Sequence, residues 1–207
     1  MKKHHQIAIM AVTVAAVGSL SGNAQIAGSA HDFSSESWNS SGEICIVCHT
    51  PHGADTTVTD APLWNHEVTS ATFTLYSSST LDASMGQPDG SSKLCLSCHD
   101  GTVAVDNFGG NTSGTEFATG DALIGTDLSN DHPVSFTDDA TLATTDGGLH
   151  DPTSTASGLG STIDADMLFN HKLQCASCHD VHNGAGVNKL LVKSNSGSAL
   201  CLTCHDK

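Results

Sequence analysis

A five-residue pattern, Cys-x-x-Cys-His, occurs four times in this 207-residue chain and constrains what the chain can fold into. The four copies use all eight cysteines, so none is left for another purpose. The copies are Cys45, Cys48 and His49; Cys95, Cys98 and His99; Cys175, Cys178 and His179; and Cys201, Cys204 and His205. Any fold of this chain must therefore present two thiols and an imidazole together at four places.

This pattern is the attachment signature of c-type haem. The two thiols form thioethers with the porphyrin, and the histidine that follows ligates the iron from one face. Paired cysteines also bind structural zinc or form disulfides in exported chains. Zinc does not need a histidine directly after each second cysteine, and disulfides explain neither the fixed spacing nor that histidine. The sequence therefore predicts four covalently bound haem c groups.

The N-terminus has the features of a secretory signal peptide. Lys2 and Lys3 precede an apolar run over residues 7–17, which is too short to span a bilayer. Cleavage after Ala24 would remove residues 1–24 and leave residues 25–207 as one tetrahaem domain. We find no transmembrane segment elsewhere and expect a secreted protein, extracellular or at the cell surface, with the periplasm as the alternative.

The chain is strongly acidic, with 22 Asp and Glu against seven Lys and Arg and a formal net charge of −15. Nucleic acids and anionic membranes attract basic surfaces, so this balance argues against both as partners. It fits a cationic or metal-bearing partner. It fits equally well an acidic surface that only keeps an exported protein soluble.

Regular secondary structure is expected to be sparse. Aromatic residues make up 4% of the chain, and the abundant Gly, Ser, Thr and Asp offer little apolar material for a core. We predict a mostly irregular multihaem cytochrome c whose haem stack serves as the core. Short helical turns are expected at the CxxCH motifs, a few short strands at places such as residues 57–64 and 71–78, and loops with short strands over residues 101–166.

The motifs are of two kinds, which alternate. The first and third carry an extra histidine three residues on, His52 in CIVCHTPH and His182 in CASCHDVH, whereas Asp follows the second and fourth. This order indicates a duplicated two-haem unit. Its copies would span residues 43–100 and 173–206, joined by a long loop segment over residues 101–172.

The two extra histidines are candidate ligands for the sixth position of iron. His52 lies on the same side of a helical turn as His49, so it is poorly placed to reach the opposite face of the same porphyrin. We expect it to ligate a neighbouring haem, and the same argument applies to His182. The alternative is that both are surface histidines near a propionate.

Other histidines extend the supply of ligands. His132 precedes Pro133, which favours an extended backbone that holds a ligand rigidly. His66 follows Trp64, an aromatic residue suited to packing on a porphyrin. Two weaker candidates are His150 and His171. The preferred set is His31, His52, His66, His132 and His182, which is one imidazole more than four irons need.

Bis-histidine iron is therefore expected at every haem. Such iron passes electrons but offers no open position to a substrate, so the predicted function is electron relay and not catalysis. A multihaem reductase would need one haem with an open distal side. A monomeric periplasmic shuttle, or the electron-donor subunit of a terminal reductase, is the competing interpretation.

Several stretches resemble an exported multihaem cytochrome family with doubled CxxCH motifs: GEICIVCHTPH, APLWNH, LYSSSTLDASMGQPDGSSKLCLSCHDGTVAVD, NDHPVSF and CASCHDVHN. More narrowly, they are similar to the tetrahaem outer-membrane cytochrome E type of metal-reducing bacteria. That resemblance implies subunits that polymerise into extracellular nanowire filaments, with haems in alternating parallel and T-shaped pairs. It also implies one iron completed by a histidine of the next subunit, and His31 is our candidate. Redox proteins or extracellular electron acceptors would be the other partners.

Overall fold

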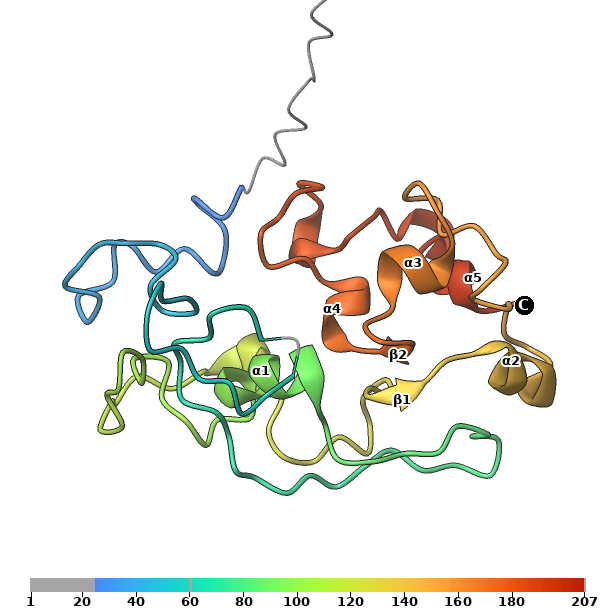
Figure 1. Ribbon diagram of the computed structural model, residues 1–207, viewed down its shortest axis with the longest axis horizontal. Helices are drawn as coiled ribbons and strands as arrows, with labels where there is room; N and C mark the ends of the chain where they lie inside the picture. The colour runs from blue at the N-terminus through green and yellow to red at the C-terminus, as the bar shows by residue number, and fades with distance from the viewer. Residues whose placement is uncertain (1–24, 60, 207) are drawn as a thin grey trace, which may run out of the picture.

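The computed structural model describes residues 25–59 and 61–206. Long irregular segments connect short elements (Figure 1). In chain order these are α1 (Gly90–His99), η1 (Gly120–Ala122), β1 (Phe136–Thr137), α2 (Ala140–Asp146), α3 (Ile163–Met167), β2 (Lys172–Leu173), α4 (Cys175–Cys178), η2 (Asn188–Leu190), η3 (Ser196–Ser198) and α5 (Cys201–Cys204). The predicted, mostly irregular fold is confirmed.

The proposed signal peptide, residues 1–24, lies outside the described residues. Within the part of the chain that the structure describes, every helix is too short or too polar to cross a bilayer.

Helical turns form at the CxxCH motifs, as predicted. The second motif ends the ten-residue α1, and α4 and α5 coincide with the Cys-x-x-Cys of the third and fourth motifs. In the first motif the Cys45 carbonyl accepts from the N–H groups of Cys48 and His49, at 3.2 and 2.8 Å, which makes a single turn. A helical turn brings residues i and i+3 to one side, so each motif presents its two thiols together.

The strands are fewer than predicted, although β1 lies within residues 101–166, where short strands are expected. β1 and β2 pair in one antiparallel sheet. The strand predictions for residues 57–64 and 71–78 are wrong, because these segments make only isolated bridges, such as that of Trp64 with His49. Their β-branched and aromatic residues favour an extended backbone, but a strand needs a partner strand, and here the partners are single residues of motifs and loops.

The segment predicted as loops with short strands, residues 101–166, also contains η1, α2 and the start of α3. α2 begins after Asp139, whose carboxylate accepts from the first turn, and ends at Gly147 in the left-handed region with φ of 69°. α3 begins after Thr162, whose hydroxyl caps it. The capping residues are present in the sequence, but helices this short carry no apolar periodicity that would reveal them.

The apolar core is divided into three small clusters. They are Val58, Trp64 and Leu94; Phe73, Leu96 and Leu128; and Ile163, Met167 and Leu200. The motif residues Cys48, Cys178 and Cys204 pack at the edges of the first and third clusters. The side chains thus form apolar patches beside the motifs in place of a continuous interior, as expected of a chain whose core haem completes.

Contacts join the N-terminal and C-terminal halves of the described chain. In Figure 1, α1 and the loops around it lie on the left, α2, α3 and α5 lie on the right, and α4, β1 and β2 lie between these two parts. α1 packs against α4. The N-terminal arm returns to the third motif, where the Gln25 N–H donates to the His182 carbonyl at 2.7 Å.

Candidate haem-binding site

Three motif histidines have one ring nitrogen held by a backbone carbonyl. The Nδ1 atoms of His49, His99 and His179 lie 2.7, 2.6 and 2.9 Å from the carbonyl oxygens of Pro62, Ala122 and Lys189. Because a carbonyl only accepts, Nδ1 carries the proton and the lone pair on Nε2 is left for a metal. This contact also fixes the orientation of the ring, as partners of metal-bound histidines do.

The first, third and fourth motifs share one backbone frame. A bridge pairs each motif histidine with a residue of another segment: His49 with Trp64, His179 with Leu191, and His205 with Leu149. The next residue of that segment donates its N–H to the second motif cysteine: Asn65 to Cys48 at 2.9 Å, Val192 to Cys178 at 3.0 Å, and His150 to Cys204 at 2.8 Å. Three different sequences therefore produce the same local geometry.

The second motif is held differently. α1 continues to His99, and the Asp100 N–H still donates to the Leu96 carbonyl at 2.8 Å. The loop after η1 supplies the outside contacts, with the N–H groups of Ile124 and Gly125 donating to the His99 carbonyl. The backbone thus groups three motifs and sets one apart, whereas the residues after the motifs alternate. The duplication of a two-haem unit stays a prediction.

The backbone carbonyls that contact the motif histidines could not be predicted from the sequence, because every residue type supplies the same carbonyl group. One signal accompanies them: a leucine directly follows each, namely Leu63, Leu123 and Leu190. Leu63 and Leu190 have left-handed φ values of 53° and 56°, which leucine rarely adopts. Leu63 and Leu123 are also exposed, at 56% and 47%. Apolar side chains held in this way beside the motif histidines fit contact with a porphyrin.

Three motif histidines face a second imidazole. The ring centroids are 6.2 Å apart for His49 and His182, 6.0 Å for His99 and His31, and 6.3 Å for His205 and His132. A metal at about 2.0 Å from a nitrogen of each ring separates the two centroids by roughly 6 Å. The residues at the first, second and fourth motifs therefore fit two-imidazole ligation of haem iron.

His31 is buried against the second motif of its own chain. Its Nδ1 is buried and has no hydrogen-bond partner among the residues described. Burial, followed by the nearby charges of His99 and His179, lowers the pKa of His31 to about 4, so the ring is neutral at physiological pH. A neutral imidazole suits a metal ligand. The arm that we expected to reach outward lies, in the single chain, on the chain itself.

His52 and His66 lie beside a cavity of about 750 Å³, which both line. His52 is exposed, and over residues 25–59 and 61–206 its ring faces no motif histidine. His66 is 2% exposed; its Nδ1 and Nε2 lie 2.8 and 3.0 Å from the carbonyl oxygens of Glu67 and Ala104. Its Nε2 also lies 3.5 Å from the Cys98 sulfur. The ring of His66 is thus engaged by backbone beside the second motif.

The two weaker candidates have other contacts. His150 contributes its backbone N–H to the frame of the fourth motif. The exposed His171 places Nδ1 2.8 Å from a carboxylate oxygen of Asp164.

The cysteines show which motifs are neighbours. Cys45 and Cys201 are exposed, and the others are partly buried: Cys48, Cys95, Cys98, Cys175, Cys178 and Cys204. Burial, followed by the nearby Cys48, raises the pKa of Cys98 to about 12. Burial, followed by Cys201, raises the pKa of Cys178. The first and second motifs therefore lie close together, as do the third and fourth.

Asp138 is a buried carboxylate in the neighbourhood of the fourth motif. It is 4% exposed, and its Oδ1 has no hydrogen-bond partner within the described part of the chain. Burial, followed by the charges of Asp139 and Asp164, raises the pKa of Asp138 to about 6. The folded state then holds this proton more tightly than the unfolded state, so stability is lost as the pH rises from about 4 to about 6.

Asp138→Asn is expected to raise the melting temperature of the haem-loaded protein near neutral pH. Removing the ionisable group removes a penalty of at most roughly 3 kcal/mol. The gain should shrink as the pH falls from about 6 towards 4 and vanish at about pH 2.5, where the carboxyl is protonated in both states. Thermal unfolding at both pH values measures it. The control is Asp151→Asn, because hydrogen bonds from Thr153 lower the pKa of that exposed carboxylate and no gain is expected. Equal melting temperatures for wild type and Asp138→Asn near neutral pH would contradict the prediction.

The comparison with known families matches the end of the chain. Residues 169–207, which contain the third and fourth motifs, match the family described as "Doubled CXXCH motif". Among curated proteins, no relative matches. The CxxCH motifs thus indicate covalently bound haem c, and the doubled motif is that of a multihaem c-type cytochrome involved in electron transfer.

Proposed function

We propose that this protein is an exported tetrahaem c-type cytochrome that relays electrons through bis-histidine haems. The observation that carries the proposal is the pairing of imidazoles at 6.0–6.3 Å on three motifs. Covalently bound haem supplies one-electron redox chemistry. The residues of the chain would hold two neutral imidazoles on each iron and so keep substrate from both faces. At His49, His99 and His179 the carbonyl acceptor keeps the proton on Nδ1 and leaves Nε2 for the metal.

In this proposal the extra histidine after the third motif ligates the iron of the first motif, and the extra histidine after the first motif ligates the iron of the third. His182, three residues after His179, faces His49 of the first motif at 6.2 Å. By the same exchange, His52 would serve His179, which has its carbonyl contact but, among the described residues, no facing imidazole. The exchange agrees with helical geometry, since a histidine three residues on lies on the wrong side of its own porphyrin.

Haem content and spin state test the proposed function. Mass spectrometry and the pyridine haemochrome spectrum of the mature protein should give four haem c groups per chain. All four should be low-spin, and the reduced protein should not bind carbon monoxide. Fewer haems would overturn the tetrahaem assignment. Carbon monoxide binding would reveal an open iron and favour a reductase.

His31 and His66 are the two candidates for the second iron ligand at the second motif. His31→Ala is expected to convert one low-spin haem to high-spin, because His31 faces His99 at 6.0 Å. His66→Ala should leave all four haems low-spin and lower the stability by about 1–3 kcal/mol, because a buried, hydrogen-bonded ring is lost. Electron paramagnetic resonance and urea unfolding of the two variants separate the effects. A high-spin signal in His66→Ala but not in His31→Ala would reverse the assignment.

We further propose that the subunits assemble into an extracellular filament, on the resemblance to the outer-membrane cytochrome E type. Among the described residues, large apolar side chains other than Leu63 and Leu123 are also exposed and are available for subunit contacts: Phe117, Ile124, Leu159 and Leu202. Electron microscopy of the haem-loaded protein from culture supernatant is expected to show thin, unbranched filaments. Discrete small particles would favour the periplasmic shuttle.

A further inference from the structure

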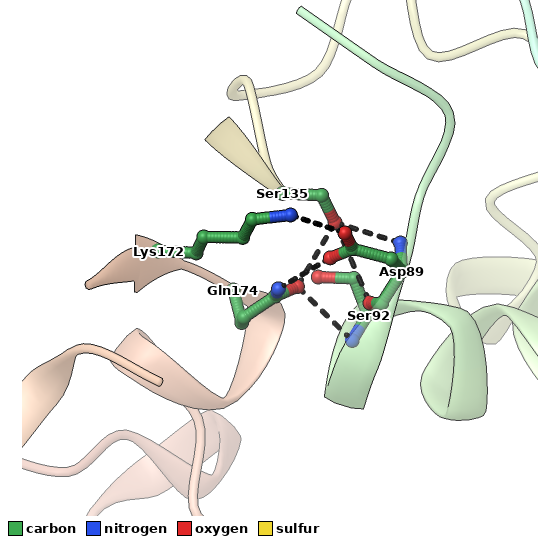
Figure 2. Close-up of polar contacts among 5 residues, drawn as sticks. All are labelled: Asp89, Ser92, Ser135, Lys172 and Gln174. Atoms are coloured by element: carbon green, nitrogen blue, oxygen red, sulfur yellow. Dashed lines mark hydrogen bonds and ion pairs between the residues drawn. The ribbon is translucent and has the colours of Figure 1, made fainter. Parts of the chain in front are cut away.

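A polar junction joins the segments that carry the second and third motifs. It consists of Asp89, Ser92, Ser135, Lys172 and Gln174 (Figure 2). Asp89 and Ser92 belong to the start of α1, Ser135 directly precedes β1, Lys172 lies in β2, and Gln174 directly precedes α4. Three separate segments of the chain therefore meet at this point.

Within the junction the two motif-bearing helices cap each other. The Gln174 Oε1 accepts from the Ser92 N–H in the first turn of α1, at 3.3 Å. In return, the Ser92 Oγ accepts from the Cys175 N–H at the start of α4, at 2.9 Å. First-turn N–H groups have no partner inside their own helix, so each side chain satisfies a donor of the other helix. Displacing α1 relative to α4 would leave buried donors without partners.

The other contacts of the junction hold Gln174 in place. Its Oε1 also accepts from the Ser135 Oγ at 2.9 Å, and its Nε2 donates to Asp89 Oδ1 at 2.8 Å. Lys172 donates to the other carboxylate oxygen of Asp89. Burial acts to raise the pKa of Asp89, but the hydrogen bonds from Lys172 and Gln174 outweigh it and keep that pKa below its usual value.

Burial and strain both indicate a rigid junction. Ser92 is 0% exposed, Gln174 2% and Ser135 5%, so these hydrogen bonds are shielded from water. Ser135 adopts a left-handed backbone with φ of 63°, and its N–H donates to the Leu173 carbonyl at 2.6 Å. Strained non-glycine residues persist where the surroundings determine their conformation and often mark functional sites.

The junction brings the two motifs into contact. Cys175 directly follows Gln174, and Cys95 lies one helical turn after Ser92. The Cys175 N–H donates to the Ser92 Oγ at 2.9 Å, and α1 packs against α4, so the two motifs lie side by side. The interaction between the two thiols raises the pKa of Cys95 and lowers that of Cys175. In the loaded protein both sulfurs would be thioethers, so the junction would hold the attachment points of two haems near each other.

We propose that this junction is the positioning element that sets the electronic coupling between the haems of the second and third motifs. Its five side chains act through the two helices and belong to no CxxCH motif. The junction joins the two ends of the molecule, where electrons pass from the first pair of motifs to the second. The inference rests on the proposed function, because it requires both motifs to be loaded.

The test uses Gln174→Leu in the haem-loaded mature protein. This change keeps the side-chain volume close to that of glutamine and removes contacts to Ser92, Ser135 and Asp89. The coupling is read from the excitonic couplet in the Soret circular dichroism of the reduced protein and from the rate of internal electron transfer after pulsed reduction. We expect a smaller couplet and a severalfold slower rate.

The matched control is Ser157→Ala. Ser157 is also 0% exposed and hydrogen-bonds with Asp166, but it lies beside the fourth motif, where Lys193 links it to Thr203. The control should lose stability and keep the couplet and the rate. An unchanged couplet and rate in Gln174→Leu, or an equal loss in both variants, would overturn the proposal.

A second pair keeps the test decisive if Gln174→Leu does not take up haem. Lys172→Met removes the ion pair with Asp89, and Lys172→Arg retains it. A smaller couplet in the methionine variant, restored in the arginine variant, supports the positioning role. Equal couplets in both would refute it. The haem count separates the two hypotheses: wild-type protein with fewer than four haems refutes the proposed function, whereas four haems with a couplet insensitive to the junction refutes only this inference.

Discussion

His182→Ala is expected to leave one of the four haems five-coordinate and high-spin. The His182 ring faces that of His49, with centroids 6.2 Å apart and planes within 13° of parallel. Truncation to alanine removes the second imidazole from the first motif and puts no other ligand in its place. One quarter of the iron should then give a high-spin signal, and the reduced variant should bind one carbon monoxide per chain.

His171→Ala is the control for that experiment. His171 is exposed and pairs with Asp164, away from any motif histidine, so its loss should leave all four haems low-spin. His52→Ala tests the exchange from the other side, and there we expect the high-spin iron at the third motif. Four low-spin haems in His182→Ala would show that the facing imidazoles are not an iron-ligating pair.

A chain that cannot attach haem is expected not to fold. Replacing all eight motif cysteines with alanine should abolish the cooperative unfolding transition and the near-ultraviolet circular dichroism. The physical reason is the size of the core: the described part of the chain buries fifteen apolar residues, nine of them in three small clusters, and these do not offset its conformational entropy. Urea unfolding of the variant beside the haem-loaded wild type measures the effect.

The outcome also distinguishes two roles of haem. A featureless urea titration of the cysteine-free chain means that haem supplies the core. A cooperative transition with a midpoint near that of the loaded protein would mean that the polypeptide folds by itself and that haem contributes little to its stability. The first result is expected, because hydrogen bonds and short helices such as the four-residue α4 and α5 are marginal without packing.

The haem-attachment motifs and the helical turns at them could be predicted from the sequence. The Cys-x-x-Cys-His spacing specifies chemistry directly, and the turn that it requires is local, so α4 and α5 could be predicted to within a residue. The scarcity of apolar residues likewise predicted an irregular fold. Both features depend on residues close together in the chain, where pattern and structure coincide.

Long-range contacts could not be predicted in the same way. Residues 57–64 have the composition of a strand, yet in the structure Trp64 bridges His49 and Pro62 supplies a carbonyl to the same ring. These contacts depend on which segment returns to which motif, and nothing in a backbone carbonyl reveals that. The reciprocal capping by Ser92 and Gln174 was missed for the same reason.

Sequence neighbours are a weak guide to which histidine lies opposite a motif histidine. His132 and His182 face motif histidines, as an iron ligand should. His66 was ranked highly because it follows Trp64, but its ring contacts two backbone carbonyls. In the single chain His31 lies against His99, and its role between subunits stays a prediction. Burial and the path of the N-terminal arm were not predictable from the sequence, and ligation stays a prediction for all five histidines.

The pairing of His49 with His182 also determines the order in which the protein can mature. Ribosomes make the first motif early, but the imidazole that faces its histidine is made only after the third motif. If His182 is the second ligand, as we propose, a haem attached to Cys45 and Cys48 while the chain is being exported would lack that ligand until residue 182 has followed. Chains truncated before residue 182 would then carry an iron with an open position at the first motif. That iron would be protected only in chains that contain His182.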